Sequence, residues 1–338
     1  MIKELTEKLI QGEDLEAGEV ALAMEEIMLA KATPLQSAAF LTALRAKKET
    51  PTEIAAAAKV MRKFLTPVRC DKEIIMDTCG TGGDCKGIFN VSTVAALVVA
   101  SIGITVAKHG NRSVSSNCGS ADLLEGLGVN INLSVPLLEQ CLREVGIAFL
   151  FAPNLHPLMK KMAPIRRELG FRTIFNILGP LSNPASATHQ LLGVFDVKLL
   201  KTFAQVLKQL NIRHALVVHG RDGLDEITTT TLTDAYEVRG KNIRRLTINP
   251  EALGIKKSRL SDLKCADFKE NIQAAEEVLS GAAGPKRDIV VLNAAAAIYL
   301  ADKAKSLKAA AAIAQEAIDS GRAQDKLNKL REFSRRSV

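Results

Sequence analysis

Apolar residues in the first 65 positions recur at helical spacing. Two such series lie at residues 5–10 and 21–28, and each places its apolar side chains on one side of a helix. Residues 33–34 and 50–51 are both Thr-Pro, which is a typical helix start with threonine as N-cap and proline at the first helical position. The pattern predicts four short helices in a small bundle.

After residue 67 the pattern changes to short apolar runs that alternate with helical segments. Runs at 74–77 and 104–107 enclose a helix-like segment at 91–102, which is the order of a βαβ unit. The segment 158–178 is helix-like and can pack back against the N-terminal bundle. Further expected elements are strands at 148–151, 215–219 and 289–292, helices at 197–210 and 302–320, and a hairpin at 229–245.

These elements predict an α/β protein with two domains. Residues 1–66 form a small helical domain, which part of 158–185 is expected to join in space. Residues 67–338 form a larger α/β domain with a central, mostly parallel sheet flanked by helices. The composition agrees, because a chain with 47% hydrophobic and only 4% aromatic residues must build its core from Ala, Leu, Ile and Val. Such residues suit helices packed on a parallel sheet.

The charge distribution favours a small phosphorylated ligand. The net charge is +8, but the Lys and Arg residues are dispersed and are not interleaved with aromatic residues, as they would be on a nucleic-acid surface. The most apolar run, 91–107, is interrupted by Ser and Thr and is too short and polar to span a membrane. The first residues lack the features of a signal peptide, and the six cysteines lack zinc-type spacing. We therefore expect a reduced, cytoplasmic enzyme that binds neither nucleic acid nor membrane.

The first of three polar loops has the sequence DTCGTGGD, residues 77–84. It follows an expected strand and precedes an expected helix, so its backbone N–H groups can point at an anion beside the helix N-terminus. Asn90, Ser92 and Thr93 follow closely and can extend this cradle with side-chain donors. The loop lacks the spacing of a P-loop or a dinucleotide fingerprint. The alternative is a tight strand-to-helix turn with an N-cap.

The second loop, residues 108–120, has the sequence KHGNRSVSSNCGS. It gathers two cations, a histidine and several hydroxyl groups directly after a buried strand. Lysine provides a point charge and arginine a bidentate fork, and both suit phosphate oxygens. The alternative is a solvated loop with serine-rich turns.

The third loop, residues 223–226, has the sequence GLDE. Adjacent carboxylates repel each other unless a cation lies between them. Magnesium is usually held by one or two carboxylates together with substrate phosphates and water, so Asp225 and Glu226 are candidate Mg²⁺ ligands. The alternative is an ordinary surface turn.

Taken together, these loops resemble the anthranilate phosphoribosyltransferase family. The matching segments, in order, are 77–84, 89–93, 108–128, 166–184 and 223–226. The resemblance implies a small α domain with an α/β domain, a homodimer formed through the α domains, and a step of tryptophan biosynthesis. In that step the amine of anthranilate displaces pyrophosphate from C1 of phosphoribosyl pyrophosphate (PRPP), with Mg²⁺ as the cofactor.

The resemblance also assigns site residues. For anthranilate they are Gly80, His109, Asn111 and Arg166, and for Mg²⁺ they are Ser92, Asp225 and Glu226. No residue is expected to act as an acid or base, so catalysis would be electrostatic and positional. The residues expected to contact PRPP are Gly80, Gly83, Asp84, Asn90, Val91, Ser92, Thr93, Lys108, His109, Gly110, Asn111, Arg112, Ser113, Val114, Ser115, Ser116 and Ser120.

Two other functions are compatible with parts of this pattern. A pyrimidine nucleoside phosphorylase shares the architecture and a phosphate-binding glycine loop, but the KHGNR segment and the Asp-Glu pair favour the transferase. A nucleic-acid-binding relative would fit the positive charge, and its affinity would fall steeply with salt. Such a protein would not need the Asp-Glu pair or the residues assigned to anthranilate, all of which are present.

The chain departs from the family pattern at two positions of the first loop. Cys85 and Ile88 stand where the family often has Gly and Thr. Ile88→Thr restores a hydroxyl group, and one added hydrogen bond should tighten PRPP binding by up to about tenfold. Calorimetric titration of the wild type and the variant checks this, and an unchanged affinity would show that the missing hydroxyl has no consequence.

Overall fold

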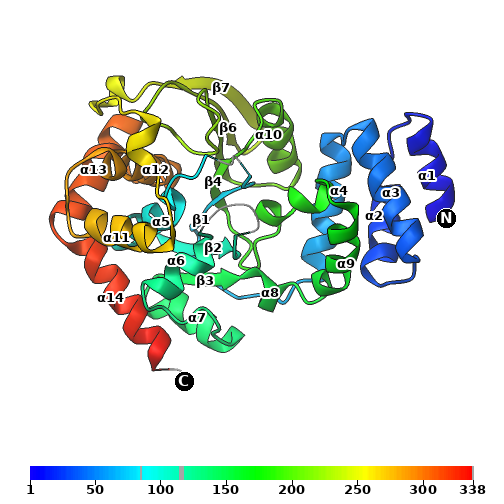
Figure 1. The fold of residues 1–338 in the computed structure, drawn as a ribbon, viewed down its shortest axis with the longest axis horizontal. Helices are drawn as coiled ribbons and strands as arrows, with labels where there is room; N and C mark the ends of the chain where they lie inside the picture. The colour runs from blue at the N-terminus through cyan, green and yellow to red at the C-terminus, as the bar shows by residue number, and fades with distance from the viewer. Residues whose placement is uncertain (84–85, 114–117, 337–338) are drawn as a thin grey trace.

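The computed structural model describes residues 1–83, 86–113 and 118–336. Figure 1 shows a helical bundle beside a larger body that is built around one sheet. The predicted N-terminal helices are confirmed. They are α1 (Ile2–Ile10), α2 (Ala17–Met28), α3 (Pro34–Lys47) and α4 (Pro51–Lys63).

The start of α4 explains how the bundle is held together. Thr50 is the N-cap, as predicted, and its side chain and that of Glu53 form a capping box. Glu53 is fully buried. Its carboxylate accepts hydrogen bonds from the N–H of Leu15 at 2.9 Å and of Thr50 at 2.7 Å, and it pairs with Lys47 at 3.0 Å. One buried carboxylate therefore ties together three segments of the bundle.

The larger body contains a seven-stranded sheet with the order β3-β2-β1-β4-β5-β6-β7. The first five strands in this order are parallel, and the predicted hairpin is present as the antiparallel pair β6 and β7. The mostly parallel sheet is thus confirmed. The strands are β1 (Ile75–Gly80), β2 (Thr105–Gly110), β3 (Ile147–Phe151), β4 (His189–Gly193), β5 (His214–Gly220), β6 (Thr233–Arg239) and β7 (Asn242–Ile248).

Helices cover both faces of the sheet. The described part of the chain also forms four short 3₁₀ helices: η1 (Ile174–Asn176), η2 (Gly179–Leu181), η3 (Glu251–Leu253) and η4 (Leu260–Leu263). The α-helices of this body are α5 (Val91–Ser101), α6 (Ser120–Gly126), α7 (Val135–Glu144), α8 (Ala152–Leu155), α9 (Met159–Leu169), α10 (Leu199–Gln209), α11 (Phe268–Leu279), α12 (Pro285–Leu300), α13 (Leu307–Asp319) and α14 (Arg322–Arg335).

Two apolar cores lie on opposite faces of the sheet. Neighbouring residues of one strand alternate between them: Leu191 belongs to the core that includes α5 and α12, and Leu192 to the core that includes the bundle. This is the period-two alternation of a strand that is buried on both faces. Helix α10 lies against the second face and contacts α4. The bundle is therefore packed onto the sheet through α10.

Helix α9 lies beside the bundle, as Figure 1 shows. It contacts α2 and α3, and Met162 of α9 belongs to the same core as the bundle helices. Residues 174–181, which include η1 and η2, contribute further side chains to that core. The segment 158–178 thus packs against the bundle, while the exact boundary between the domains remains a prediction.

One predicted strand is wrong and one strand was not predicted. Residues 289–292 lie inside α12, which is buried on nearly every side, so its continuous apolar run has the appearance of a buried strand. Strand β4 escaped prediction because His189 and Gln190 make it look polar. Gln190 is buried nonetheless, and its amide donates to Pro180 O at 2.6 Å.

The role of Glu53 gives a stability prediction. Glu53→Ala leaves two backbone N–H groups without their acceptor and removes one of the two carboxylates that pair with the ammonium of Lys47, the other being Asp14. The free energy of unfolding should therefore fall by about 3 kcal/mol. Urea denaturation checks this, with Glu7→Ala as the control because Glu7 is exposed on α1. Equal stability of the two variants would contradict the role assigned to Glu53.

Candidate active site

The first polar loop connects β1 to α5 and begins in a buried position. Asp77 and Thr78 are inaccessible to solvent. Beyond them, the N–H of Gly82 donates to Asp225 Oδ2 at 3.0 Å, and Gly83 O accepts from the guanidinium of Arg172 at 2.9 Å. The backbone of this loop is thus joined to the third predicted loop. Asp84 and Cys85 lie outside the described residues.

The residues at the start of α5 connect the first loop to Lys108 and to the second loop. Ser92 lies in the first turn of α5, at 3.3 Å from the ammonium of Lys108. Asn90 precedes α5, and its amide donates to Cys118 O at 2.7 Å, which links the first loop to the second. Val91 and Thr93 are buried, and the hydroxyl of Thr93 has no hydrogen-bond partner among the described residues.

Lys108 is the centre of the charged part of the site. It is only 3% exposed, although it sits at the end of β2. Its ammonium donates to Thr78 O at 2.6 Å and reaches Ser92 Oγ. Burial lowers the pKa of Lys108, while the carboxylates of Asp77 and Glu226 act in the opposite direction. A buried cation thus faces the place where the first and third loops meet.

Asp77 lies behind Lys108. Burial raises the pKa of Asp77 to about 6, although the charge of Lys108 and several hydrogen bonds oppose the shift. Its carboxylate accepts from the N–H of His109 at 3.2 Å and from the side-chain amide of Asn183 at 2.8 Å. Because the same amide also donates to Ala107 O, the end of β2 is held in one position.

The third loop, between β5 and β6, reaches the first loop because two glycines leave room for it. A Cβ atom on Gly80 would lie 2.5 Å from Asp225 Oδ2, and one on Gly193 would collide with the backbone of Asp225. Leu224 is fully buried and anchors the loop. The pair Asp225 and Glu226 is therefore turned toward the ends of β1 and β4. It is not a surface turn.

The second loop contributes less charge than its sequence suggests. Arg112 is exposed and forms ion pairs with Asp122 at 2.8 Å and with Glu125 at 2.5 Å. Its charge is already compensated, so Arg112 is not placed as a free phosphate ligand here. The hydroxyl of Ser120 donates to Asn111 O at 3.2 Å, which brings together the two ends of the loop.

Gly110 and Ser113 border this part of the loop. A side chain on Gly110 would meet Ser120 and Phe149, and the N–H of Ser113 donates to Asp122 at 3.2 Å. The predicted contacts at Val114, Ser115 and Ser116 lie outside the described residues.

Two neutral histidines, His109 and His156, lie beside the charged residues around Lys108. His109 Nδ1 donates to Gly179 O at 3.1 Å, and its Nε2 lies 3.1 Å from Nε2 of His156. Burial lowers the pKa of His109 to about 3 and that of His156 to about 4, so both rings are neutral at neutral pH. His156 was not predicted from the sequence, because an isolated histidine with no metal-type spacing carries no signal of its partner.

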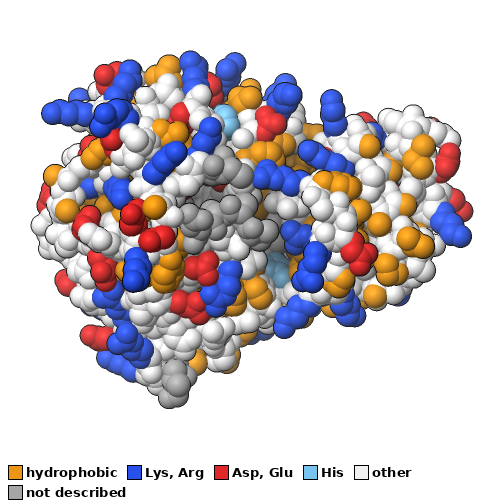
Figure 2. Space-filling model, in the orientation of Figure 1, with side chains coloured by type: hydrophobic (Ala, Val, Ile, Leu, Met, Phe, Trp, Pro, Cys, Tyr) orange, Lys and Arg blue, Asp and Glu red, His pale blue; other side chains and the backbone are white. Residues whose placement is uncertain are grey.

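Arg166 lies on α9, on the bundle side of the molecule. It is half-buried, and burial lowers its pKa. No hydrogen bond or ion pair engages its guanidinium within the described residues. Figure 2 shows Lys and Arg side chains on both sides of the hollow between the bundle and the larger body. This hollow is a suitable place for an anion.

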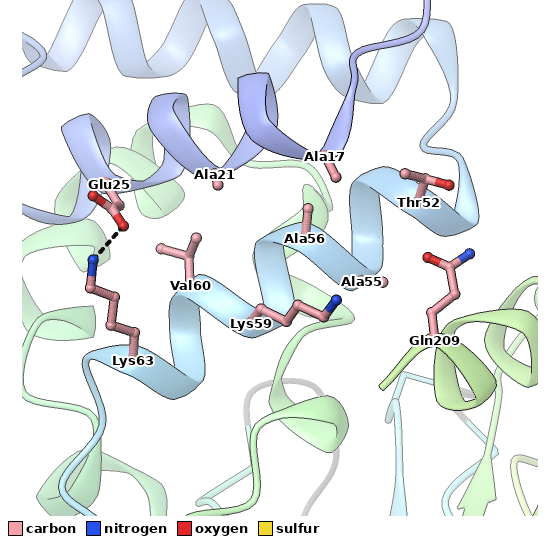
Figure 3. Close-up of a pocket in the computed structure, with 10 residues that line it drawn as sticks. All are labelled: Ala17, Ala21, Glu25, Thr52, Ala55, Ala56, Lys59, Val60, Lys63 and Gln209. Carbon is pink, nitrogen blue, oxygen red and sulfur yellow. Dashed lines mark hydrogen bonds and ion pairs between the residues drawn. The ribbon is translucent and has the colours of Figure 1, made fainter. Parts of the chain in front are cut away.

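A separate cavity of about 270 Å³ lies between α2, α4 and the end of α10 (Figure 3). Small side chains such as Ala21 and Ala56 form its walls, with Lys59 and the Lys63–Glu25 ion pair at its edge. None of the predicted site residues lines it. We therefore place the candidate site at the strand ends and not in this cavity.

The described residues contain no group of three or more His, Cys, Asp or Glu side chains arranged to hold a metal ion. Magnesium bound by one or two carboxylates and by phosphate oxygens requires no such group. Within the same residues, no helix is long and apolar enough to cross a bilayer.

Comparison with known proteins identifies the class. Residues 3–65 match the helical bundle domain of a glycosyl transferase family, and residues 72–324 match the α/β domain of that family. The chain therefore belongs to this glycosyl transferase family, as its bundle, its sheet and the position of its polar loops indicate.

Full-length relatives narrow this to one family. An anthranilate phosphoribosyltransferase of Anaeromyxobacter dehalogenans is 51% identical over 98% of both chains. The crystal structure of the enzyme of that name from Thermus thermophilus is 43% identical and has a TM-score of 0.93, with 98% of this chain and 99% of that chain covered. The Saccharomyces cerevisiae enzyme, solved in complex with PRPP and Mg, is 29% identical with a TM-score of 0.92, and 99% and 98% are covered. The chain is a member of the anthranilate phosphoribosyltransferase family.

The histidine pair gives a prediction of pH dependence. Because folding lowers both histidine pKa values from about 6.5, the stability that the neutral rings contribute is present above that pH and is lost as the pH falls. The free energy of unfolding should therefore decrease between about pH 6 and pH 4.5. In His156→Asn this slope should be smaller by about 1.4 kcal/mol per pH unit, whatever the absolute stability of the variant.

Thermal or urea unfolding across this pH range measures the slope. Equal slopes in the wild type and in His156→Asn would show that the pair is not held neutral in the folded protein.

Proposed function

We propose that this chain transfers the phosphoribosyl group of PRPP to the amine of anthranilate, a step of L-tryptophan biosynthesis. The main support is structural. The backbone of Gly80–Gly82, the ammonium of Lys108 and the Asp225-Glu226 pair come together at one end of the sheet. The neutral His109–His156 pair lies directly beside them. A charged cradle next to an uncharged pocket wall suits one polyanionic and one aromatic substrate. The family membership of the whole chain supports the same reaction.

The charged cradle is proposed to hold PRPP. The ammonium of Lys108 and the N-terminus of α5 provide positive charge where the phosphate groups would lie. Asp225, Glu226 and Ser92 are proposed to hold Mg²⁺, since carboxylate and hydroxyl oxygens are the ligands that this ion prefers. When bound, Mg²⁺ would neutralise charge on the departing pyrophosphate. The remaining predicted PRPP contacts stay predictions, and Arg112 is the least supported of them because two carboxylates already engage it.

The uncharged side is proposed to receive anthranilate. A half-buried guanidinium without an acidic partner is suited to a carboxylate, and Arg166 provides one on α9. Asn111 is exposed on the second loop, where its amide can meet the same substrate. Gly80 and His109 would border the ring.

The reaction forms a bond between the amine nitrogen and C1 of the ribose, while the bond from C1 to the pyrophosphate oxygen breaks. The amine loses a proton, which passes to solvent. Both ring nitrogens of His109 have partners within the protein, so this histidine is not free to act as the base. Catalysis would rest on positioning and on electrostatic stabilisation of the leaving group.

The direct test mixes purified protein with anthranilate, PRPP and Mg²⁺ and follows the loss of anthranilate fluorescence. We expect a loss that requires all three components. Phosphorolysis of thymidine or uridine in its place would favour the nucleoside phosphorylase. Binding to DNA that weakens steeply with salt, without turnover, would favour the nucleic-acid-binding alternative. A cytoplasmic location and a homodimer remain predictions from the sequence.

The assignment of Arg166 gives a kinetic prediction. Arg166→Ala removes a charged hydrogen-bond donor to the carboxylate of anthranilate, so kcat/KM for anthranilate should fall by roughly ten- to a hundredfold. Arg167→Ala is the matched control, because Arg167 is the exposed neighbour on the same helix. Equal kinetics of the two variants would refute the assignment.

A further inference from the structure

Three consecutive backbone carbonyls of η2 accept hydrogen bonds from side chains of three different elements. The first belongs to Gly179, and it is the carbonyl that holds the ring of His109. Each donor comes from a separate part of the fold, so the segment is a junction between them. The pairs are Gly179 O with His109 Nδ1 of β2 at 3.1 Å, Pro180 O with Gln190 Nε2 of β4 at 2.6 Å, and Leu181 O with Arg62 Nε of α4 at 2.7 Å.

The residues that follow η2 are fixed by other contacts, to β1 and β2. The amide of Asn183 donates to Asp77 and to Ala107 O, both at 2.8 Å, and its oxygen accepts from the N–H of Ala185. Asn183 is 4% exposed. Because this end is fixed to β1 and β2, a change at Leu181 will displace the part that includes Gly179.

Arg62 is the donor from the helical bundle. Within the described residues it makes the only side-chain hydrogen bond between residues 1–65 and the rest of the chain. It is half-buried and has no carboxylate partner there, and burial lowers its pKa. Keeping an unpaired charge in such a place costs free energy, which a purely structural contact between two apolar surfaces would avoid.

We infer that Arg62 is a positioning residue for the acceptor substrate. It holds η2 against the bundle and, through Gly179 O, sets the orientation of His109 and His156 at the wall of the anthranilate pocket. This inference rests on the proposed function, which assigns that wall to anthranilate. It assigns to the bundle a role in the site, although none of the residues predicted from the sequence to bind substrate belongs to α1–α4.

The PRPP side should not depend on Arg62. The ammonium of Lys108 is held by Thr78 O and Ser92 Oγ, which belong to β1 and α5. Neither contact involves η2. A substitution at Arg62 should therefore separate the two substrates kinetically, whereas a general loss of folding would affect both.

Steady-state kinetics with three variants test this. Arg62→Met keeps the apolar stem and removes the donor, so the KM for anthranilate should rise by about tenfold while the KM for PRPP stays within about twofold. Arg62→Lys retains a donor for Leu181 O and should recover most of the loss. Lys63→Met is the control, because the neighbouring Lys63 is exposed and paired with Glu25 at 2.7 Å (Figure 3).

An equal rise of both KM values, or a Met variant that behaves like the wild type, would overturn the inference.

A second measurement does not depend on turnover. The chain has five histidines, so their imidazole signals can be resolved by NMR and assigned by substitution. Arg62→Met should shift the signals of His109 and His156 and leave that of His214, which is bound to Glu237 and Leu300, unchanged. If the wild type lacks transferase activity, the proposed function fails, and this spectrum still decides whether Arg62 positions the pair. Unchanged His109 and His156 signals would show that it does not.

Discussion

The close approach of Asp225 to the ends of β1 and β4 is the constraint on which the site depends. Two glycines permit it: Gly80 faces the carboxylate of Asp225, and Gly193 faces its backbone. With any side chain at Gly193 the third loop would have to move outward. The carboxylate pair would then lose its place beside the first loop and beside Lys108. A site for a polyanion with a metal ion is thus made possible by the absence of two side chains.

At the same end of the sheet, a charged side chain and a neutral one lie close together. Lys108 and His109 are consecutive, yet one is a buried cation among carboxylates and the other a neutral ring beside His156. The side chains of neighbouring residues on a strand point to opposite faces, which accounts for the separation. Asp77 and Asn183 fix the backbone between them. A transferase that joins an aromatic amine to a highly charged donor needs both environments next to each other.

Much of the fold could be predicted from local chemistry. Thr-Pro pairs mark the starts of α3 and α4 because their capping needs only residues within one turn. The strand at 289–292 was wrong because a short apolar run does not distinguish a buried strand from a buried helix. Strand β4 escaped because its polar side chains are satisfied by residues of other elements, such as Cys79 of β1 for Gln190.

Some parts of the candidate site could likewise be predicted from local sequence, and others could not. The glycine loop and the Asp-Glu pair are continuous in sequence and could be found there. The partnership of His109 with His156 spans 47 positions, and that of Arg62 with Leu181 spans 119. Neither pairing leaves a local pattern. Arg112 shows the opposite case: its sequence context suggests a phosphate ligand, and the sequence does not show that Asp122 and Glu125 of α6 pair with it. Its contact with PRPP stays a prediction.

The central claim is that the carboxylate pair, held in place by the glycines, creates a metal-dependent site for PRPP. Calorimetric titration of PRPP with and without Mg²⁺ tests it, in the wild type and in Gly193→Ala, with Gly18→Ala as control because a Cβ there meets nothing within 4 Å. We predict that Mg²⁺ strengthens binding in the wild type and the control. In folded Gly193→Ala the gain should be lost, with affinity lower by at least about tenfold. Equal, Mg²⁺-dependent affinity in all three proteins would contradict the account.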